Sequence, residues 1–160
     1  MRRVLITGSR KWRDRPAVYN ALDEQLLRSP QGMVVINGCC PEGADALAHV
    51  WYLDRRDQGY PVHEESYPAD WYRDCDENCY HAPRTKGGRN YCPVAGHLRN
   101  QQMVDSGADI CLAFPIGTKA SKRSRGTWDC MTRAKRAGID VYNLGVDQEL
   151  DDRQQMRGWA

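Results

Sequence analysis

The chain has 160 residues, and its 23 basic against 21 acidic side chains leave a formal net charge of +2, which is too balanced to indicate nucleic-acid binding from bulk charge. No stretch approaches the ~18 consecutive apolar residues of a membrane span. The seven cysteines are an odd number, which argues against a disulfide framework, and the length favours one domain with its own hydrophobic core.

Short apolar runs alternate with segments of helical periodicity along the chain. The first run, in MRRVLITG, is too short for the apolar region of a signal peptide, so we interpret it as a strand and expect a cytoplasmic protein. The pattern predicts strands at 3–6, 33–36, 61–66, 110–114 and 141–144. It predicts helices at 14–27, 42–56, 98–107 and 126–137, the first capped by Asp14. This order indicates an α/β fold, a three-layer sandwich whose five-stranded, mostly parallel sheet is covered on both faces.

The segment 70–94 interrupts this alternation, because it has few aliphatic residues and many Asp, Arg, Gly, Asn and Pro. A loop of this length inside a compact domain needs a functional or structural reason. We therefore expect one domain over 1–145 with 70–94 as an inserted metal-binding loop. The remaining 146–160 form a C-terminal tail, either flexible or folded as a short helix.

Three clustered cysteines explain the inserted loop as a metal site. Cys75, Cys79 and Cys92 are the expected thiolate ligands, and the fourth ligand is His81 or His97, of which we favour His81 because it lies within the loop. Thiolates with imidazole at short spacing favour Zn²⁺, and four protein ligands make a closed, structural site. The alternative is that these cysteines are unpaired in a mobile loop.

Gly-containing turns end three of the strands just before a helix, at the sheet edge where ligands bind in such folds. They cover 7–10, 38–45 and 125–127. Backbone N–H groups in these turns can receive phosphate oxygens, and helix N-termini such as Gly43-Ala44 add the positive end of a dipole. Asp45 either accepts from a ribose hydroxyl or caps its helix. The basic run at 119–125 (KASKRSR) is either a solvated loop or a phosphate contact.

The order TGSR, NGxxxEGADALA, RNQQMVDSGADICLAFP and SRGTWDCMTRAKRAGI resembles small SLOG-superfamily proteins of the YspA- and YpsA-related (DUF2493) group, over about residues 3–144. That group is found in bacteria and their phages, has a Rossmann-like fold and is thought to bind nucleotides or nucleotide-derived ligands. The resemblance implies that the site is lined by Gly8, Ser9, Arg10, Gly43, Asp45, Arg99, Asn100, Gly126 and Thr127. Gly38 and Ala44 of the second turn complete the candidate set.

The wider superfamily includes the cytokinin-activating LOG phosphoribohydrolases, which use an Arg and a PGGxGTxxE motif with a catalytic Glu. Arg99 matches that Arg, but Cys130 stands at the position of the Glu, and Asp129 is one residue off. We therefore expect a nucleotide-binding protein. The alternative is a hydrolase that cleaves an N-glycosidic or phosphoester bond of a nucleotide on the same site. Nucleic acid and membrane partners are not expected, and a homo-oligomer remains open.

Overall fold

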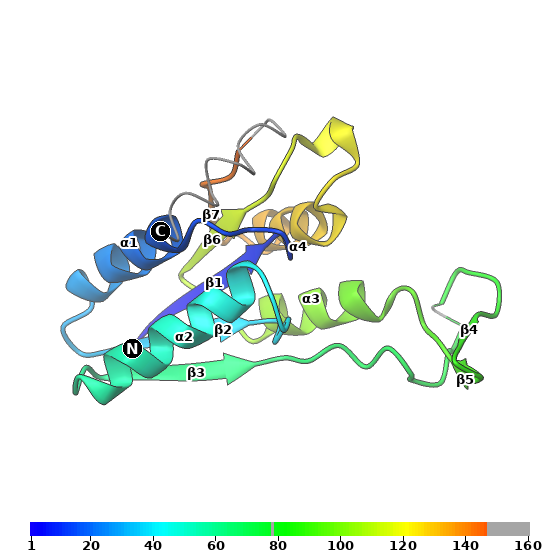
Figure 1. The fold of residues 1–160 in the computed structure, drawn as a ribbon, viewed down its shortest axis with the longest axis horizontal. Coiled ribbons are helices and arrows are strands. Elements are labelled where there is room, and N and C mark those ends of the chain that lie inside the picture. The colour runs from blue at the N-terminus through cyan, green and yellow to red at the C-terminus, as the bar shows by residue number, and fades with distance from the viewer. Residues whose placement is uncertain (78, 147–160) are drawn as a thin grey trace.

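Residues 1–77 and 79–146 are described by a computed structural model (Figure 1). Among these residues, five strands form one sheet in the spatial order β3-β2-β1-β6-β7, and every pairing within it is parallel. They are β1 (Arg2–Gly8), β2 (Met33–Asn37), β3 (Val62–Ser66), β6 (Ile110–Phe114) and β7 (Asp140–Asn143). This confirms the α/β, Rossmann-like prediction. The strand order reverses between β1 and β6, which is where such sheets place their ligands.

Helices cover both faces of the sheet, as the three-layer prediction required. They are α1 (Arg15–Leu27), α2 (Ala44–Asp57), α3 (Ala95–Asp105) and α4 (Arg125–Arg136). Val4 and Ile6 of β1 join the core under α1 and α2, while Leu5 joins the core under α3 and α4. Because successive strand side chains point to opposite faces, a strand buried on both sides must be apolar throughout. This requirement explains the near-continuous apolar runs in the sequence.

Two helix starts differ from the expected positions for local reasons. The second helix begins at Ala44 and not at residue 42, because Gly43 holds a φ of 77° that α-helical backbone does not adopt. The third begins at Ala95 and not near residue 98, with the Ala95 N–H donating to the Cys92 carbonyl at 3.2 Å. Gly96 lies in its first turn, and the poor helix propensity of glycine hid this start in the sequence.

The sequence analysis expected 70–94 to be an irregular loop, but this segment contains some regular structure. It holds a small antiparallel hairpin of β4 (Thr85–Lys86) and β5 (Arg89–Asn90), away from the main sheet in Figure 1. Gly87 and Gly88 form its two-residue turn with φ of 60° and 75°, as hairpin turns with two positive φ angles require. Strands of two residues are too short to show periodicity, so the sequence missed them.

The loop after β6 contains one 3-10 turn, η1 (Lys119–Ser121), before α4 begins. The tail expected at 146–160 lies outside the described residues, except for Val146, which pairs with Ile116 beyond the ends of β7 and β6. Of the helices in the described ranges, none has both the length and the apolar character needed to cross a membrane.

Candidate functional site

A pocket of about 440 Å³ opens at the carboxyl ends of β1, β2 and β6. The turns after these three strands, the start of α3 and the start of α4 form its walls. This is the sheet edge at which the sequence analysis expected a ligand. Eight of the expected site residues line the pocket: Gly8, Ser9, Arg10, Asp45, Arg99, Asn100, Gly126 and Thr127.

The other three expected residues, Gly38, Gly43 and Ala44, do not line the pocket. They allow the turns to pack closely behind it. A Cβ on Gly43 would lie 2.2 Å from the Ser9 carbonyl oxygen, and a Cβ on Gly8 would lie 2.4 Å from the Ala44 Cβ. A Cβ on Gly38 would lie 2.5 Å from Arg99 Nη1. The glycines of the first and second turns therefore allow the two turns to pack against each other, and allow Arg99 to pack against the second turn.

Backbone amides at two of the turns are already used within the protein. The Ser9 N–H donates to the Phe114 carbonyl at 3.0 Å, and the Ala44 N–H donates to the Ser9 carbonyl at 3.3 Å. These two amides are not free to receive a phosphate oxygen, contrary to the expectation from the turn motifs.

The start of α4 differs from the other two turns. The first N–H groups of a helix have no partner within the helix, and Ser124 provides no side-chain cap here. The Ser124 hydroxyl instead bonds the Ile116 N–H and carbonyl, each at 3.0 Å, which fixes the turn. A Cβ on Gly126 would meet nothing within 4 Å, so the space beside it is open. Among the three turns, this one has the geometry of an anion site.

Arg99 fastens three parts of the pocket wall together. Its Nη1 donates to the Gly38 carbonyl after β2 and, at 3.4 Å, to the Tyr67 carbonyl after β3. Its Nε donates to Asn100 Oδ1 at 3.2 Å, and Asn100 Nδ2 in turn donates to the Gly126 carbonyl at 3.0 Å. Arg99 and Asn100 therefore link the second turn to the start of α4.

Asp45 is buried at the back of the pocket. It is not the N-cap of α2, because that position belongs to Gly43, which makes no side-chain cap bond. The carboxylate accepts from the Cys40 N–H at 3.3 Å. Burial raises the pKa of Asp45, and interactions with Cys40 and Arg99 offset this only in part. Burial also raises the pKa of the neighbouring Cys40 thiol to about 11, so Cys40 is a neutral group at the pocket wall.

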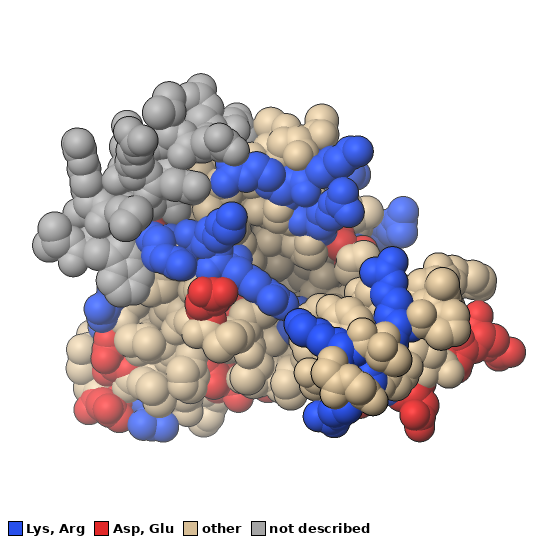
Figure 2. Space-filling model, turned by 45° about the vertical axis from the view of Figure 1, so that its right-hand side comes forward, with Lys and Arg blue, Asp and Glu red and all other residues tan. Residues whose placement is uncertain are grey.

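Positive charge dominates the pocket. Its lining contains five cationic side chains against the single carboxylate of Asp45: Arg10, Lys11, Arg99, Arg123 and Arg125. Figure 2 shows Lys and Arg side chains gathered around a hollow on this face. The basic run at 119–125 was the sequence signal for Arg123 and Arg125, and its position supports the phosphate-contact interpretation over the solvated one. Lys11 had no such signal.

An aromatic wall closes one side of the pocket, and it comes from the inserted segment. The Trp71 ring lines the pocket, stacks on Tyr91 at 5.8 Å between ring centroids, and lies under the Arg10 guanidinium at 5.7 Å. A Cβ on Gly96 would lie 3.0 Å from the Trp71 ring, so α3 approaches this side chain closely. The sequence analysis did not assign Trp71 to the pocket, because no spacing relates it to the three turns.

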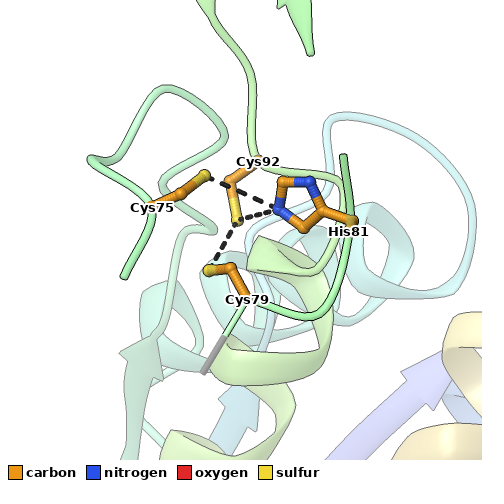
Figure 3. A group of neighbouring side chains, drawn as sticks. All are labelled: Cys75, Cys79, His81 and Cys92. Atoms are coloured by element: carbon orange, nitrogen blue, oxygen red, sulfur yellow. Dashed lines mark hydrogen bonds between the residues drawn. The ribbon is translucent and has the colours of Figure 1, made fainter. Parts of the chain in front are cut away.

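Cys75, Cys79, His81 and Cys92 point toward a common centre (Figure 3), and their ligand atoms all lie within 4.8 Å of one another. Cys79 Sγ lies 3.7 Å from Cys92 Sγ, and His81 Nε2 lies 3.6 Å from Cys75 Sγ and 3.9 Å from Cys92 Sγ. A tetrahedral zinc ion with Zn–S near 2.3 Å and Zn–N near 2.0 Å has ligand–ligand distances of about 3.5–3.8 Å. The four side chains therefore fit one ion of that size.

The choice of histidine also follows from the structure. His97 lines the pocket, while His81 lies with the three cysteines. His81 Nδ1 lies 2.7 Å from the Ala82 carbonyl, which fixes the proton on Nδ1 and leaves Nε2 to face the cysteines. Arg73 Nη1 lies 2.9 Å from Cys79 Sγ and 3.7 Å from Cys92 Sγ. Burial raises the pKa of the Cys92 thiol, but the contact with Arg73 outweighs this and the pKa is lowered, which favours a thiolate there.

The cysteine cluster and the pocket share a wall. The Cys92 N–H donates to the Trp71 carbonyl at 2.7 Å, and the next residue along the chain, Pro93, lines the pocket. Gly96 and His97, in the first turn of α3, line it too. The position of Cys92 therefore sets both the position of Trp71 and the start of α3.

Comparison with known proteins agrees with the fold. The family model described as "YspA, cpYpsA-related SLOG family" matches residues 2–73. The chain is 46% identical over 145 residues to the Gene 61 protein of Mycobacterium phage D29, which covers 91% of this chain and 98% of the phage protein. No solved structure matches the chain.

Proposed function

Because the chain belongs to the YspA, cpYpsA-related SLOG family, we propose that it binds a nucleotide or a nucleotide-derived ligand in the pocket at the carboxyl ends of β1, β2 and β6. The observation that carries this proposal is the composition of the pocket: five cationic side chains and an open helix start surround one buried carboxylate. Such a lining attracts a phosphate group and disfavours an uncharged ligand.

The residues suit different parts of a nucleotide. A phosphate group is received by the amides at Gly126 and Thr127, with the guanidinium groups of Arg10 and Arg125 beside them, since the planar fork of Arg binds phosphate oxygens bidentately. The Asp45 carboxylate accepts from a ribose hydroxyl. The Trp71 ring offers an apolar face to the base or the sugar.

We expect binding and not hydrolysis of the LOG type. Cys130, at the position of the catalytic Glu, is completely buried, and burial raises the pKa of its thiol to about 12. Asp129 accepts from Asn100 Nδ2 at 3.0 Å and from Arg133 Nε at 2.8 Å, and it does not line the pocket. Neither side chain is placed to act on a ligand there.

The cysteine cluster completes the proposal as a structural zinc site. Four protein ligands leave no open coordination position, so the ion would hold the inserted segment and the Trp71 wall in place. Elemental analysis should find about one zinc per chain in the wild type and His97→Ala proteins, and none in Cys75→Ser or His81→Ala. Full zinc content in His81→Ala would contradict this ligand set.

A thermal-shift screen of nucleoside mono- and diphosphates at millimolar concentration tests the pocket. A ligand present at about 100 times its Kd stabilises a protein by ~2.7 kcal/mol, so binding should raise the melting temperature clearly. Arg99→Ala should abolish the shift and Arg10→Ala should reduce it. Arg28→Ala, at the C-terminal end of α1, is the control and should leave it unchanged. The same melting temperature with every nucleotide would overturn the proposal.

A further inference from the structure

A second concave site adjoins the pocket on the outer face of α4. It has a volume of about 330 Å³, and Arg123 and Arg125 line both this site and the pocket. The two hollows are therefore adjacent, and these two arginines line both of them. We name the second one the α4 groove; Trp128, Lys119 and Arg136 also line it.

The α4 groove is strongly positive, because five cationic side chains and one carboxylate line it. Its one carboxylate, Asp129, already accepts from Arg133 Nε at 2.8 Å and from Asn100 Nδ2 at 3.0 Å. Among the described residues, Arg125, Arg136 and Lys119 have no acidic partner. Cations that gather in a concavity without a balancing carboxylate from the described part of the chain form a site for an anion.

Trp128 adds an observation independent of charge. Its indole Nε1 is buried and has no hydrogen-bond partner among the described residues. A buried donor without an acceptor is costly, and native structures leave few such groups. Trp128 lines the α4 groove, so an acceptor oxygen bound there would satisfy this N–H once the ring turns it toward the groove, and an indole N–H can only donate.

We propose that the α4 groove binds a second phosphate group of the ligand whose first phosphate occupies the pocket. This inference rests on the proposed function and names its ligand class more closely: a nucleotide with two phosphate groups separated by a sugar. A nucleoside 3′,5′-bisphosphate and a dinucleotide both have this chemistry. A nucleoside 5′-diphosphate lacks this arrangement, because its two phosphate groups are joined to each other on one side of the sugar.

Calorimetric titration with four probes tests the inference: adenosine 5′-monophosphate, adenosine 5′-diphosphate, adenosine 3′,5′-bisphosphate and the dinucleotide pApA. The second phosphate should tighten binding of the bisphosphate, of pApA or of both by about tenfold or more over the monophosphate, as a charged hydrogen-bonded contact does. The 5′-diphosphate should gain less. Whichever of the two separated-phosphate probes gains more identifies the form of the ligand.

Two variants test whether the gain in affinity comes from the α4 groove. Trp128→Phe keeps an aromatic ring and removes the N–H, and Arg136→Gln removes one exposed cation. Each should bring the affinity of the tighter probe down toward that of the monophosphate and leave monophosphate affinity unchanged. Arg56→Gln, on α2, is the matched surface control.

The outcomes separate the two proposals. Monophosphate binding without a gain from a separated phosphate would overturn the α4-groove inference and leave the pocket proposal standing. An equal loss for the monophosphate and the separated-phosphate probes in both variants would also overturn it, because the groove would then not be a distinct subsite. No binding of any of the four probes would overturn both proposals.

Discussion

The parallel sheet and the inserted segment 70–94 are ordered by different physical means. Every residue of β2 and β6 is buried, and apolar side chains on both faces of these strands join two continuous cores. In the inserted segment, Cys92 is the one buried residue among those described. A segment that buries so little apolar surface needs another source of order, and a metal ion held by the four side chains of the cysteine cluster would supply it.

The two regions meet at the pocket. The sheet supplies the turns after β1, β2 and β6, and the inserted segment supplies Trp71 and, through Cys92, the start of α3. From this comparison we expect the sheet to fold by itself and the pocket to be complete only when the inserted segment is ordered. The experiments below separate the two contributions.

Loss of a metal ligand should have the largest effect. Cys92→Ser should lose zinc and leave the inserted segment open to trypsin at Arg84, Lys86 and Arg89, while the sheet stays resistant. Cys39→Ser, an exposed cysteine outside the cluster, should keep its zinc and its resistance. Timed trypsin digestion followed by mass spectrometry measures both. Wild-type resistance of a zinc-free Cys92→Ser protein would show that the segment does not depend on the metal.

Trp71→Ala should weaken ligand binding in the pocket without loss of the metal. The zinc content should remain near one per chain, because Cys92 bonds the backbone carbonyl of Trp71, which the substitution keeps. Nucleotide affinity should fall by about tenfold, since an aromatic or cation–π contact is worth roughly 1–2 kcal/mol. Trp71→Phe should recover most of the affinity. Calorimetry and elemental analysis on the same samples provide the comparison, and unchanged affinity would remove Trp71 from the site.

A smaller effect is expected on stability, from Asp45→Asn. Because the pKa of Asp45 is raised in the folded protein, the folded state holds this proton more tightly than the unfolded state does, and wild-type stability rises as pH falls through the raised pKa. The charged carboxylate therefore costs stability at neutral pH. The Asn variant should be more stable than wild type above the raised pKa, and this advantage should vanish as pH falls below the ordinary value of 3.8.

Urea unfolding of the wild type and the Asn variant at a series of pH values measures this dependence. The same variant should bind nucleotides less tightly, because the proposed ribose acceptor is weakened. A variant that is less stable than wild type at neutral pH would mean that the charge of Asp45 is better compensated than its burial indicates.

The smallest expected effect is on catalysis. No free base should be released from adenosine 5′-monophosphate or from cytokinin nucleotides on prolonged incubation, because Cys130 is buried and Asp129 is bound by Asn100 and Arg133. Chromatography of the reaction mixture detects such release directly. Base release that disappears in Asp129→Asn would favour the hydrolase interpretation over the binding one.

The sequence predicted the sheet well because burial on both faces requires apolar runs such as those of β1, β2 and β6. It also predicted the cysteine cluster, whose members lie close together along the chain. Both patterns involve residues that are near one another along the chain, so they can be recognised in a single sequence.

Features that depend on distant residues were harder to predict. Gly38 and Gly43 have the appearance of ligand contacts in the sequence, but their space is taken by Arg99 and by the Ser9–Arg10 backbone. Trp71 lies at the pocket because its carbonyl accepts a hydrogen bond from the Cys92 N–H, and these two residues are 21 positions apart in an irregular segment. The basic run at 119–125 pointed to the loop side of the α4 groove, but no signal in the sequence pointed to Trp128 and Arg136, which α4 contributes to it.

Hydrogen–deuterium exchange of the zinc-loaded and chelator-treated protein tests the central comparison most directly. The account predicts that zinc removal strips protection from the described residues of 70–94 and from the first turn of α3, while amides of β1, β2 and β6 exchange as slowly as before. Re-addition of zinc should restore the pattern. Equal protection of the inserted segment with and without zinc, or a loss of protection spread evenly over the sheet, would contradict it.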